Sequence, residues 1–448
     1  MAVAISIVSL SLPHMSEAKT LEEALAAAYQ GNPEILSGRA KLRAVDEQMP
    51  QALSGWRPTA SASFDTGRSK VESSTATDTR QSRKPHTASL TITQSLYEGG
   101  RTESAIRNAD NSIIAERARL TDVEQTVLLN GATAFLDVFR AQAVLELNIN
   151  NEEVLKRQLE ATRDRFDVGE ITRTDVHQAE ARLARATADT IQARGNLKAA
   201  QATYLKITGE VSGVLDKPEM HIALPSSAVD SVNIAVENNP GVISAEYDQR
   251  AAQDDIASVR GELLPSIDLE GSASRSLNAS GESTMNETFA AKVTLTVPLY
   301  QSGSVYSRLR EARQTAAQLR RDIDTARRDA TEEAAQAWEN LQTSRARIES
   351  FKAQIKAAEV ALEGVEREAA VGSRTVLDVL DAEQELLDAK VSIVGAERDE
   401  MVAVFQLKSA LGELTASHLD LPVERYDEKQ HYEKVRNQWA GGAVEDEK

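Results

Sequence analysis

The side chains whose types and spacing could do chemistry gather in two short segments, 168–175 and 371–378. Each segment opens with Val-Gly and closes with Thr-x-x-Asp, and a further carboxylate, Asp381, follows one helical turn after Asp378. Clustered carboxylates are used for proton transfer and for attracting cations. The pattern also has a simpler explanation, because glycine suits the end of one helix and Thr-x-x-Asp caps the start of the next. Capping alone accounts for Asp175 and Asp378, whereas Asp381 gains only a small benefit from the helix dipole.

Little else in the sequence offers the groups that catalysis or metal binding needs. The chain has no Cys, and its six His are scattered without a pair at metal-ligand spacing. Disulfides, thiolate metal sites and a Cys nucleophile are therefore excluded. No Gly-rich phosphate loop or Ser/His/Asp arrangement stands out, and a formal net charge of −18 argues against a nucleic-acid binder. We expect no enzyme activity, no cofactor, no metal ion and no nucleic-acid partner.

The sequence contains two copies of one plan. The Asn-Pro pair at 32–33 recurs at 239–240, an offset of 207 residues, whereas the Val-Gly pairs of the two turns are 203 residues apart. The first copy must therefore carry four extra residues between these landmarks, and insertions belong in surface loops. The pattern divides the chain into a first repeat (19–210), a linker (211–230), a second repeat (231–414) and a charged C-terminal tail (415–448) that we expect to be partly disordered.

The residues before the first repeat have the character of a secretory signal. The segment from Ala2 to Leu12 is apolar and rich in hydroxyl groups, and Ser16 and Ala18 supply small residues three and one positions before a cut. This pattern predicts a signal peptide over 1–18, cleaved after Ala18, although no Lys or Arg precedes Lys19. No later run of 18 apolar residues exists, which excludes a transmembrane helix.

Long helices are predicted in both copies. Proline is absent from 86–217 and from 299–421, so nothing there interrupts a helix. From Val305 to Val365, small or apolar residues recur at alternating spacings of four and three, with one extra spacing of four around Ala330. This is the seam of a coiled coil with a local stutter. A helix over about 101–168 would be about 100 Å long at 1.5 Å per residue.

Four short segments have a different character, because small or polar residues alternate in them with apolar ones. Each repeat holds two of them, which follow a Pro and are joined by a loop rich in Ser, Thr, Gly or Asn. They are predicted to be two strand pairs. Four strands cannot close a barrel, but three chains would supply twelve, which lies within the range of outer-membrane barrels. The predicted strands cover about 59–65, 89–96, 266–273 and 291–297.

These features together resemble the TolC family of outer-membrane channel-tunnels over about residues 20–415. The resemblance rests on the order and spacing of several motifs, none of which is decisive alone. They are Thr20-Leu-Glu-Glu-Ala-Leu25 with Asn32-Pro33, the strand-to-helix turns 96–101 and 298–303, the hairpin turns 166–175 and 371–381, and Lys408-Ser-Ala-Leu-Gly412.

The resemblance implies a mainly α fold with a β-barrel part. Three identical chains would form a twelve-stranded barrel in the lipid of the outer membrane, with four strands from each chain. A long α-helical coiled-coil tunnel would continue the barrel into the periplasm. The implied function is the passive exit duct of a tripartite efflux or type I secretion system, in which an inner-membrane ABC or RND-type transporter supplies the energy. The duct would open when that transporter and a periplasmic adaptor recruit it.

The resemblance also assigns a periplasmic gate to the two hairpin turns. The second turn would lie at the constricted end, with Asp378 and Asp381 facing the lumen. Threefold symmetry would make each a ring of carboxylates that attracts cations and repels anions. Asp175 would belong to the same gate, and Arg173 and Arg374 could hold it shut through ion pairs between hairpins.

Adaptor docking is expected beside the same turns, on Val168, Gly169, Val371 and Gly372. The geometry of the hairpin turns explains these four residues equally well. The family has a Tyr just before the second Val-Gly pair, where this sequence has Ala369, which predicts a differently organised clasp.

A competing interpretation is a soluble coiled-coil scaffold with no channel. It explains the helical seam and the acidity but leaves the four strand-like segments unexplained.

Overall fold

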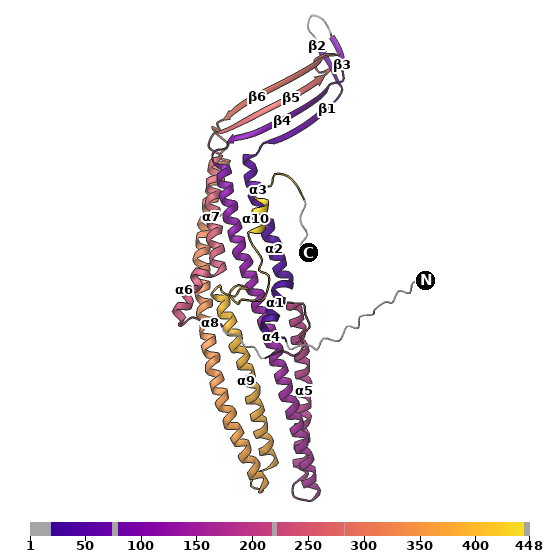
Figure 1. Ribbon diagram of the computed structural model, residues 1–448, viewed down its shortest axis with the longest axis vertical. Coiled ribbons are helices and arrows are strands. Elements are labelled where there is room, and N and C mark those ends of the chain that lie inside the picture. The colour runs from indigo at the N-terminus through magenta and orange to yellow at the C-terminus, as the bar shows by residue number, and fades with distance from the viewer. Residues whose placement is uncertain (1–18, 74–78, 217–221, 282, 443–448) are drawn as a thin grey trace, which may run out of the picture. The chain divides into compact units, whose positions relative to one another are not determined.

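The computed structural model describes residues 19–73, 79–216, 222–281 and 283–442, so the predicted signal peptide at 1–18 lies outside the described residues. The first half of the chain contains α1 (Leu21–Gly31), α2 (Pro33–Asp46), α3 (Gln48–Leu53), the 3-10 turn η1 (Ser54–Trp56), β1 (Thr59–Thr66), β2 (Ser69–Ser73), β3 (Thr79–Arg83), β4 (His86–Tyr97), α4 (Arg101–Asp167) and α5 (Arg173–Thr208). The second half contains α6 (Ala228–Asn238), α7 (Pro240–Gly261), β5 (Ser266–Leu277), β6 (Met285–Thr296), α8 (Ser304–Ala370) and α9 (Val376–Ala410), followed by α10 (Gln430–Val435) (Figure 1).

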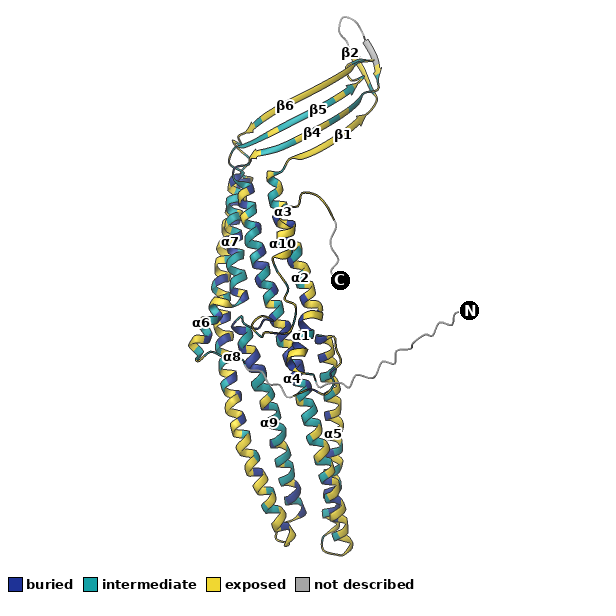
Figure 2. Cartoon of the chain, in the orientation of Figure 1, coloured by how far each residue is buried: buried dark blue, intermediate teal, exposed yellow. Residues whose placement is uncertain are grey.

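The order of the elements confirms the internal duplication and the mainly α fold. Both halves run from helices (α1 to α3 in the first half, α6 and α7 in the second) through two strands of one sheet to a long helix and a shorter return helix. The two long helices, α4 and α8, have the same length of 67 residues. In α8, every residue of the predicted seam is buried or half-buried (Figure 2). None of the helices in the described ranges is long and apolar enough to cross a membrane.

The four long strands form one antiparallel sheet in the order β1-β4-β5-β6. β1 and β6 are the edge strands, and neither has a further strand partner among the described residues. Because side chains alternate between the faces of a strand, the register gives the sheet one apolar and one polar face. Directly opposed residues form an apolar row, Ala62, Leu90, Ala273 and Phe289, and a polar row on the other face, Thr59, Thr93, Glu270 and Lys292.

The sheet differs from the prediction in its extent. β4, β5 and β6 are each 12 residues long. β6 begins six residues before the predicted 291. The prediction missed its first residues, Met-Asn-Glu-Thr, because they lack a clear apolar alternation. β2 and β3 were not predicted because they are short and polar. They pair with each other in the connection between β1 and β4, where the first copy carries its additional residues.

The chain divides into two compact units, and the first comprises residues up to 39, 120–242 and 327–426. Its main core contains the fully buried Phe135, Tyr204 and Phe405. The counterpart of Phe135 in the second copy, Trp338, packs against a second cluster. The second unit comprises 40–119, 243–326 and the residues from 427 onward, and it contains the sheet.

The C-terminal segment is more ordered than the sequence suggested. In the first unit, Ala416 and Leu421 belong to the main core, and the guanidinium of Arg39 lies over the rings of Tyr29 and Tyr426 at 4.8 and 4.9 Å. In the second unit, α10 is held by the Tyr432 hydroxyl, which donates a hydrogen bond of 2.9 Å to Asp110. These parts of 415–442 are therefore packed, because scattered apolar side chains bury themselves within a charged stretch.

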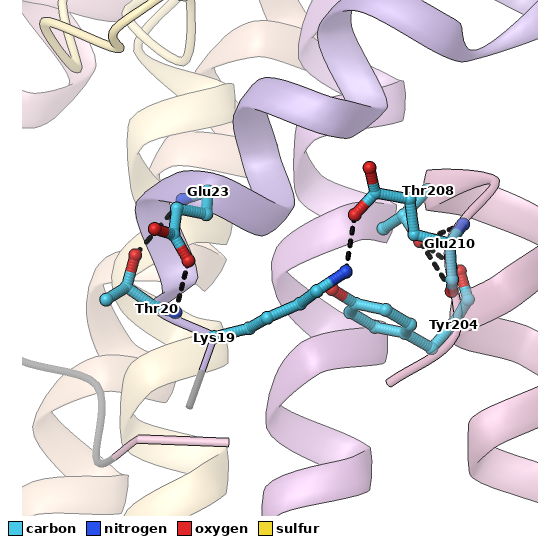
Figure 3. A network of polar contacts seen from close by, with 6 residues as sticks. All are labelled: Lys19, Thr20, Glu23, Tyr204, Thr208 and Glu210. Carbon is cyan, nitrogen blue, oxygen red and sulfur yellow. Dashed lines mark hydrogen bonds and ion pairs between the residues drawn. The ribbon is translucent and has the colours of Figure 1, made fainter. Parts of the chain in front are cut away.

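The start of α1 is fixed by the network in Figure 3. Thr20 and Glu23 form a capping box in which the Glu23 N–H donates to the Thr20 hydroxyl at 3.2 Å and the Thr20 N–H donates to the Glu23 carboxylate at 3.1 Å. The neighbouring Lys19 Nζ lies 2.5 Å from the Glu210 carboxylate, just beyond the end of α5, close to the buried ring of Tyr204. The beginning and the end of the first repeat are thus tied together.

Candidate gate at the helical hairpin turns

Two helical hairpins, α4–α5 and α8–α9, carry the predicted site, and their turns lie at the same end of the first unit (Figure 1). Both turns begin with the same backbone device. Gly169 and Gly372 each have φ of +82°, in the left-handed region. Their N–H groups donate to the carbonyls of Phe166 (2.9 Å) and Ala369 (3.1 Å), and the following residue donates to the carbonyl five positions earlier. These bonds define a Schellman motif, which glycine adopts without the penalty of a side chain.

The two valines before these glycines are directed away from the cores. Val168 is 73% exposed and Val371 is 81% exposed. Isolated exposed valines are common on protein surfaces. Here both turns combine an exposed valine with a hydrogen-bonded backbone turn, so the arrangement occurs once in each copy.

The helices that leave the turns begin with matching capping boxes. The Thr375 N–H and hydroxyl donate to Asp378 Oδ2 at 2.9 and 2.8 Å, and the Asp378 N–H donates to Thr375 Oγ1 at 3.3 Å. Thr172 and Asp175 form the same three bonds. The hydrogen bonds from the Thr375 backbone and hydroxyl lower the pKa of Asp378, and the nearby Arg374 adds a smaller effect in the same direction. The structure therefore places the predicted carboxylates at the helix starts, where capping engages them.

The arginines of the predicted clasp are arranged differently from the expectation. Arg374 Nε lies 2.9 Å from the carboxylate of Glu368, which belongs to the same hairpin, and this ion pair raises the pKa of Arg374. In the first hairpin, Arg165 pairs with Glu170 at 3.1 Å. Arg173 is exposed, and within the described part of the chain no ion pair to it is recorded. Within one chain, neither Arg374 nor Arg173 joins the two hairpins.

An arginine that the sequence did not single out makes that connection instead. Arg182 on α5 donates to the carboxylate of Asp381 on α9, and we call this ion pair the hairpin clasp. Beside the clasp, a small apolar core joins the hairpins through residues such as Leu159, Val176 and Leu380. Arg182 lies two helical turns after Asp175, on the same helix face, and this spacing is the only signal that could have drawn attention to it. In the described ranges, no group of three or more His, Asp or Glu side chains could hold a metal ion.

Comparison with known proteins establishes the family. The model of the outer membrane efflux protein family matches residues 24–210 and 232–413, and the chain belongs to this family. It is 33% identical to the outer membrane efflux protein BepC of Brucella suis over 94% of this chain and 92% of that protein. It is 28% identical to the outer membrane protein TolC of Escherichia coli over 90% of this chain and 84% of that protein. The structure of the outer membrane protein VceC from Vibrio cholerae shares the fold, with a TM-score of 0.77, 20% identity and coverage of 88% and 96%.

Family membership confirms the resemblance to the TolC family, the outer-membrane location and the role as an efflux and secretion channel. It also decides between the two interpretations of the long helices. The soluble scaffold is wrong, because the sheet and the helical hairpins together make the fold of an outer-membrane channel.

Proposed function

We propose that three copies of this chain form one passive duct that crosses the outer membrane and continues into the periplasm. The observation that carries the proposal is the four-stranded sheet with two open edges and two chemically different faces. Open strand edges demand pairing partners, and a barrel of twelve strands satisfies all of them. Apolar side chains such as Phe289, which is 82% exposed in the single chain, would then face lipid. The polar row with Glu270 and Lys292 would line the lumen.

Light scattering during size-exclusion chromatography of detergent-extracted outer membranes tests this proposal. We expect a protein mass about three times that of the mature chain, obtained only in detergent. A monomer or dimer recovered from the soluble fraction would mean that the strands close no shared barrel. The chain would perform no chemistry, so an inner-membrane ABC or RND-type transporter and a periplasmic adaptor would supply the energy and the recruitment.

The turns of the two hairpins form the periplasmic gate of this duct. Asp378 and Asp381 would each contribute a ring of three carboxylates, which attracts cations. Arg173 and Asp175 of the first turn and Arg374 of the second turn would surround these rings. Single-channel recordings of Asp378→Asn combined with Asp381→Asn should show weaker block by multivalent cations. Unchanged block would mean that these carboxylates do not line the conduction path.

The adaptor would dock on the turns, around Val168, Gly169, Val371 and Gly372. The exposure of both valines on rigid turns supports this assignment. Because the chain has no Cys, Val168→Cys and Val371→Cys each introduce a single reactive thiol. We expect a thiol-reactive crosslinker to join them to the adaptor in cells. The equally exposed Val229, on α6, provides a control as Val229→Cys, and equal crosslinking at all three positions would contradict docking at the turns.

A further inference from the structure

An ion pair near the turn of the first hairpin has no equivalent at the matching positions of the second. Arg163 near the end of α4 lies 2.8 Å from the carboxylate of Glu180 on α5, and His177 Nδ1 lies 3.0 Å from the same carboxylate. The hydrogen bond from Arg163 and then that from His177 lower the pKa of Glu180. This pair connects the two helices of the hairpin close to its turn.

The offset of 203 residues gives the matching positions in the second hairpin, Glu366 on α8 and Glu383 on α9. The carboxylate of Glu180 is retained as Glu383, whereas the arginine has become a second carboxylate. The Glu383 Oε2 atom is buried and has no hydrogen-bond partner. Burial, with a further contribution from the charge of Glu366, raises the pKa of Glu383 to about 7.

Cations on α8, α9 and the adjoining α5 are engaged with other groups. On α8, Arg367 pairs with Glu363, which is on its own helix. On α9, Lys390 pairs with Glu359, and on α5, Arg182 belongs to the hairpin clasp. No described cation offsets the repulsion between the two carboxylates.

A second charge reversal between the copies shows that compensation was possible. Arg165 in the first hairpin corresponds to Glu368 in the second. That reversal is accompanied by a new partner, because Glu368 pairs with Arg374. The reversal from Arg163 to Glu366 has no such compensation, although the two hairpins share the same backbone.

We propose that Glu366 and Glu383 form a proton-dependent switch that loosens the second hairpin when Glu383 ionises. With Glu383 protonated, α8 and α9 pack together without a buried charge. When Glu383 loses its proton, a carboxylate without a partner faces a second carboxylate, and the helices separate more readily near the turn. The Arg163–Glu180 pair keeps the first hairpin closed throughout. The switch is a property of the hairpin itself, and only its consequence for channel opening rests on the proposed function.

The sign and size of the effect follow from proton linkage. The pKa of Glu383 is about 7 in the closed hairpin, whereas the ordinary pKa of Glu is 4.5. Between these two pH values the closed hairpin binds more protons than the opened one, so the stability of the closed hairpin falls as the pH rises. If Glu383 regains its ordinary pKa on opening, the local opening constant should increase about tenfold between pH 6 and pH 8. The first hairpin provides an internal reference in the same molecule.

Hydrogen exchange of the full-length protein in detergent tests the switch. After correction for the chemical exchange rate, peptides around 360–386 should exchange about tenfold faster at pH 8 than at pH 6. Glu383→Gln should remove this difference, and Glu366→Arg should remove it by restoring the pair found in the first hairpin. The exposed Glu385 on the same helix supplies the control Glu385→Gln, which should keep the difference.

An equal pH effect in Glu383→Gln, or no effect in the unmodified protein, would overturn the proposal. The exchange readout does not depend on conduction. Failure to find a trimer or a conducting channel would therefore count against the proposed function alone.

Discussion

Removing the hairpin clasp should make the closed gate easier to open. Arg182→Gln replaces the guanidinium with a shorter, uncharged polar side chain, so Asp381 loses its partner on α5. The side chains of the clasp are 26% and 56% exposed. Partly exposed ion pairs of this kind contribute about 0.2–1 kcal/mol each. In the proposed homotrimer, three clasps break together, which gives about 0.6–3 kcal/mol, or roughly a 3- to 150-fold shift in the opening equilibrium.

Single-channel recording in planar bilayers measures this shift as the fraction of time spent in the open state. Arg185, one turn further along α5, gives the matched control Arg185→Gln, because its partner Asp189 lies on the same helix. The effect of Arg182→Gln should shrink at high salt, since ions screen exposed pairs. Exchanging the charges, with Arg182→Asp and Asp381→Arg together, should restore much of the closed state. The reasoning fails if Arg185→Gln opens the channel equally, or if the exchanged pair stays as open as the single variants.

Three further predictions concern stability. Gly372→Ala forces a side chain into a left-handed conformation and should destabilise the second turn by about 1–2 kcal/mol. The control Gly364→Ala lies within α8 with no atom near the new methyl group, and it should stabilise the helix by about 0.5–1 kcal/mol. The rate of proteolysis at the turn compares the two variants. Thr375→Val should cost about 0.5–2 kcal/mol as a lost cap. Thr375→Val should also remove the acid sensitivity of the α9 start. The lowered pKa of Asp378 stabilises the folded state at pH values above 3.8, the ordinary pKa of Asp, and this contribution is lost as the pH falls through the pKa of the folded state. Hydrogen exchange measured across this acidic range tests the prediction. Phe405→Ala, at a fully buried position, should cost about 3–5 kcal/mol in thermal unfolding.

The parts of the fold that the sequence could predict are those fixed by local chemistry. The absence of proline and the regular seam mark the long helices, and Gly with Thr-x-x-Asp marks both ends of each turn. Gly372 occupies the predicted conformation, because few other residues tolerate a positive φ at that point. Asp378 makes the predicted cap for an equally local reason.

The parts that could not be predicted depend on how distant elements pack. The clasp joins Arg182 to Asp381, 199 residues further along the chain, and the partner depends on the rotation of two helices about their axes. The composition of the tail predicted partial disorder, yet Ala416 and Leu421 are buried because the core offers a surface for them. Composition describes the average of a segment, whereas a few apolar side chains decide whether it packs.

The differences between the two copies point to the gate more directly than the motifs they share. The shared motifs are backbone requirements: a positive φ at Gly169 and Gly372 and matching capping boxes. Losing any of them costs about 0.5–2 kcal/mol, so both copies are more stable when they keep them. Exposed ion pairs contribute less and can change without loss of the fold. Charges at matched positions are therefore free to diverge, and the reversal from Arg163 to Glu366 gives one hairpin a cross-link and the other a repulsion. In the proposed duct, the first hairpin of each chain would therefore stay closed, and the second would be the one that opens.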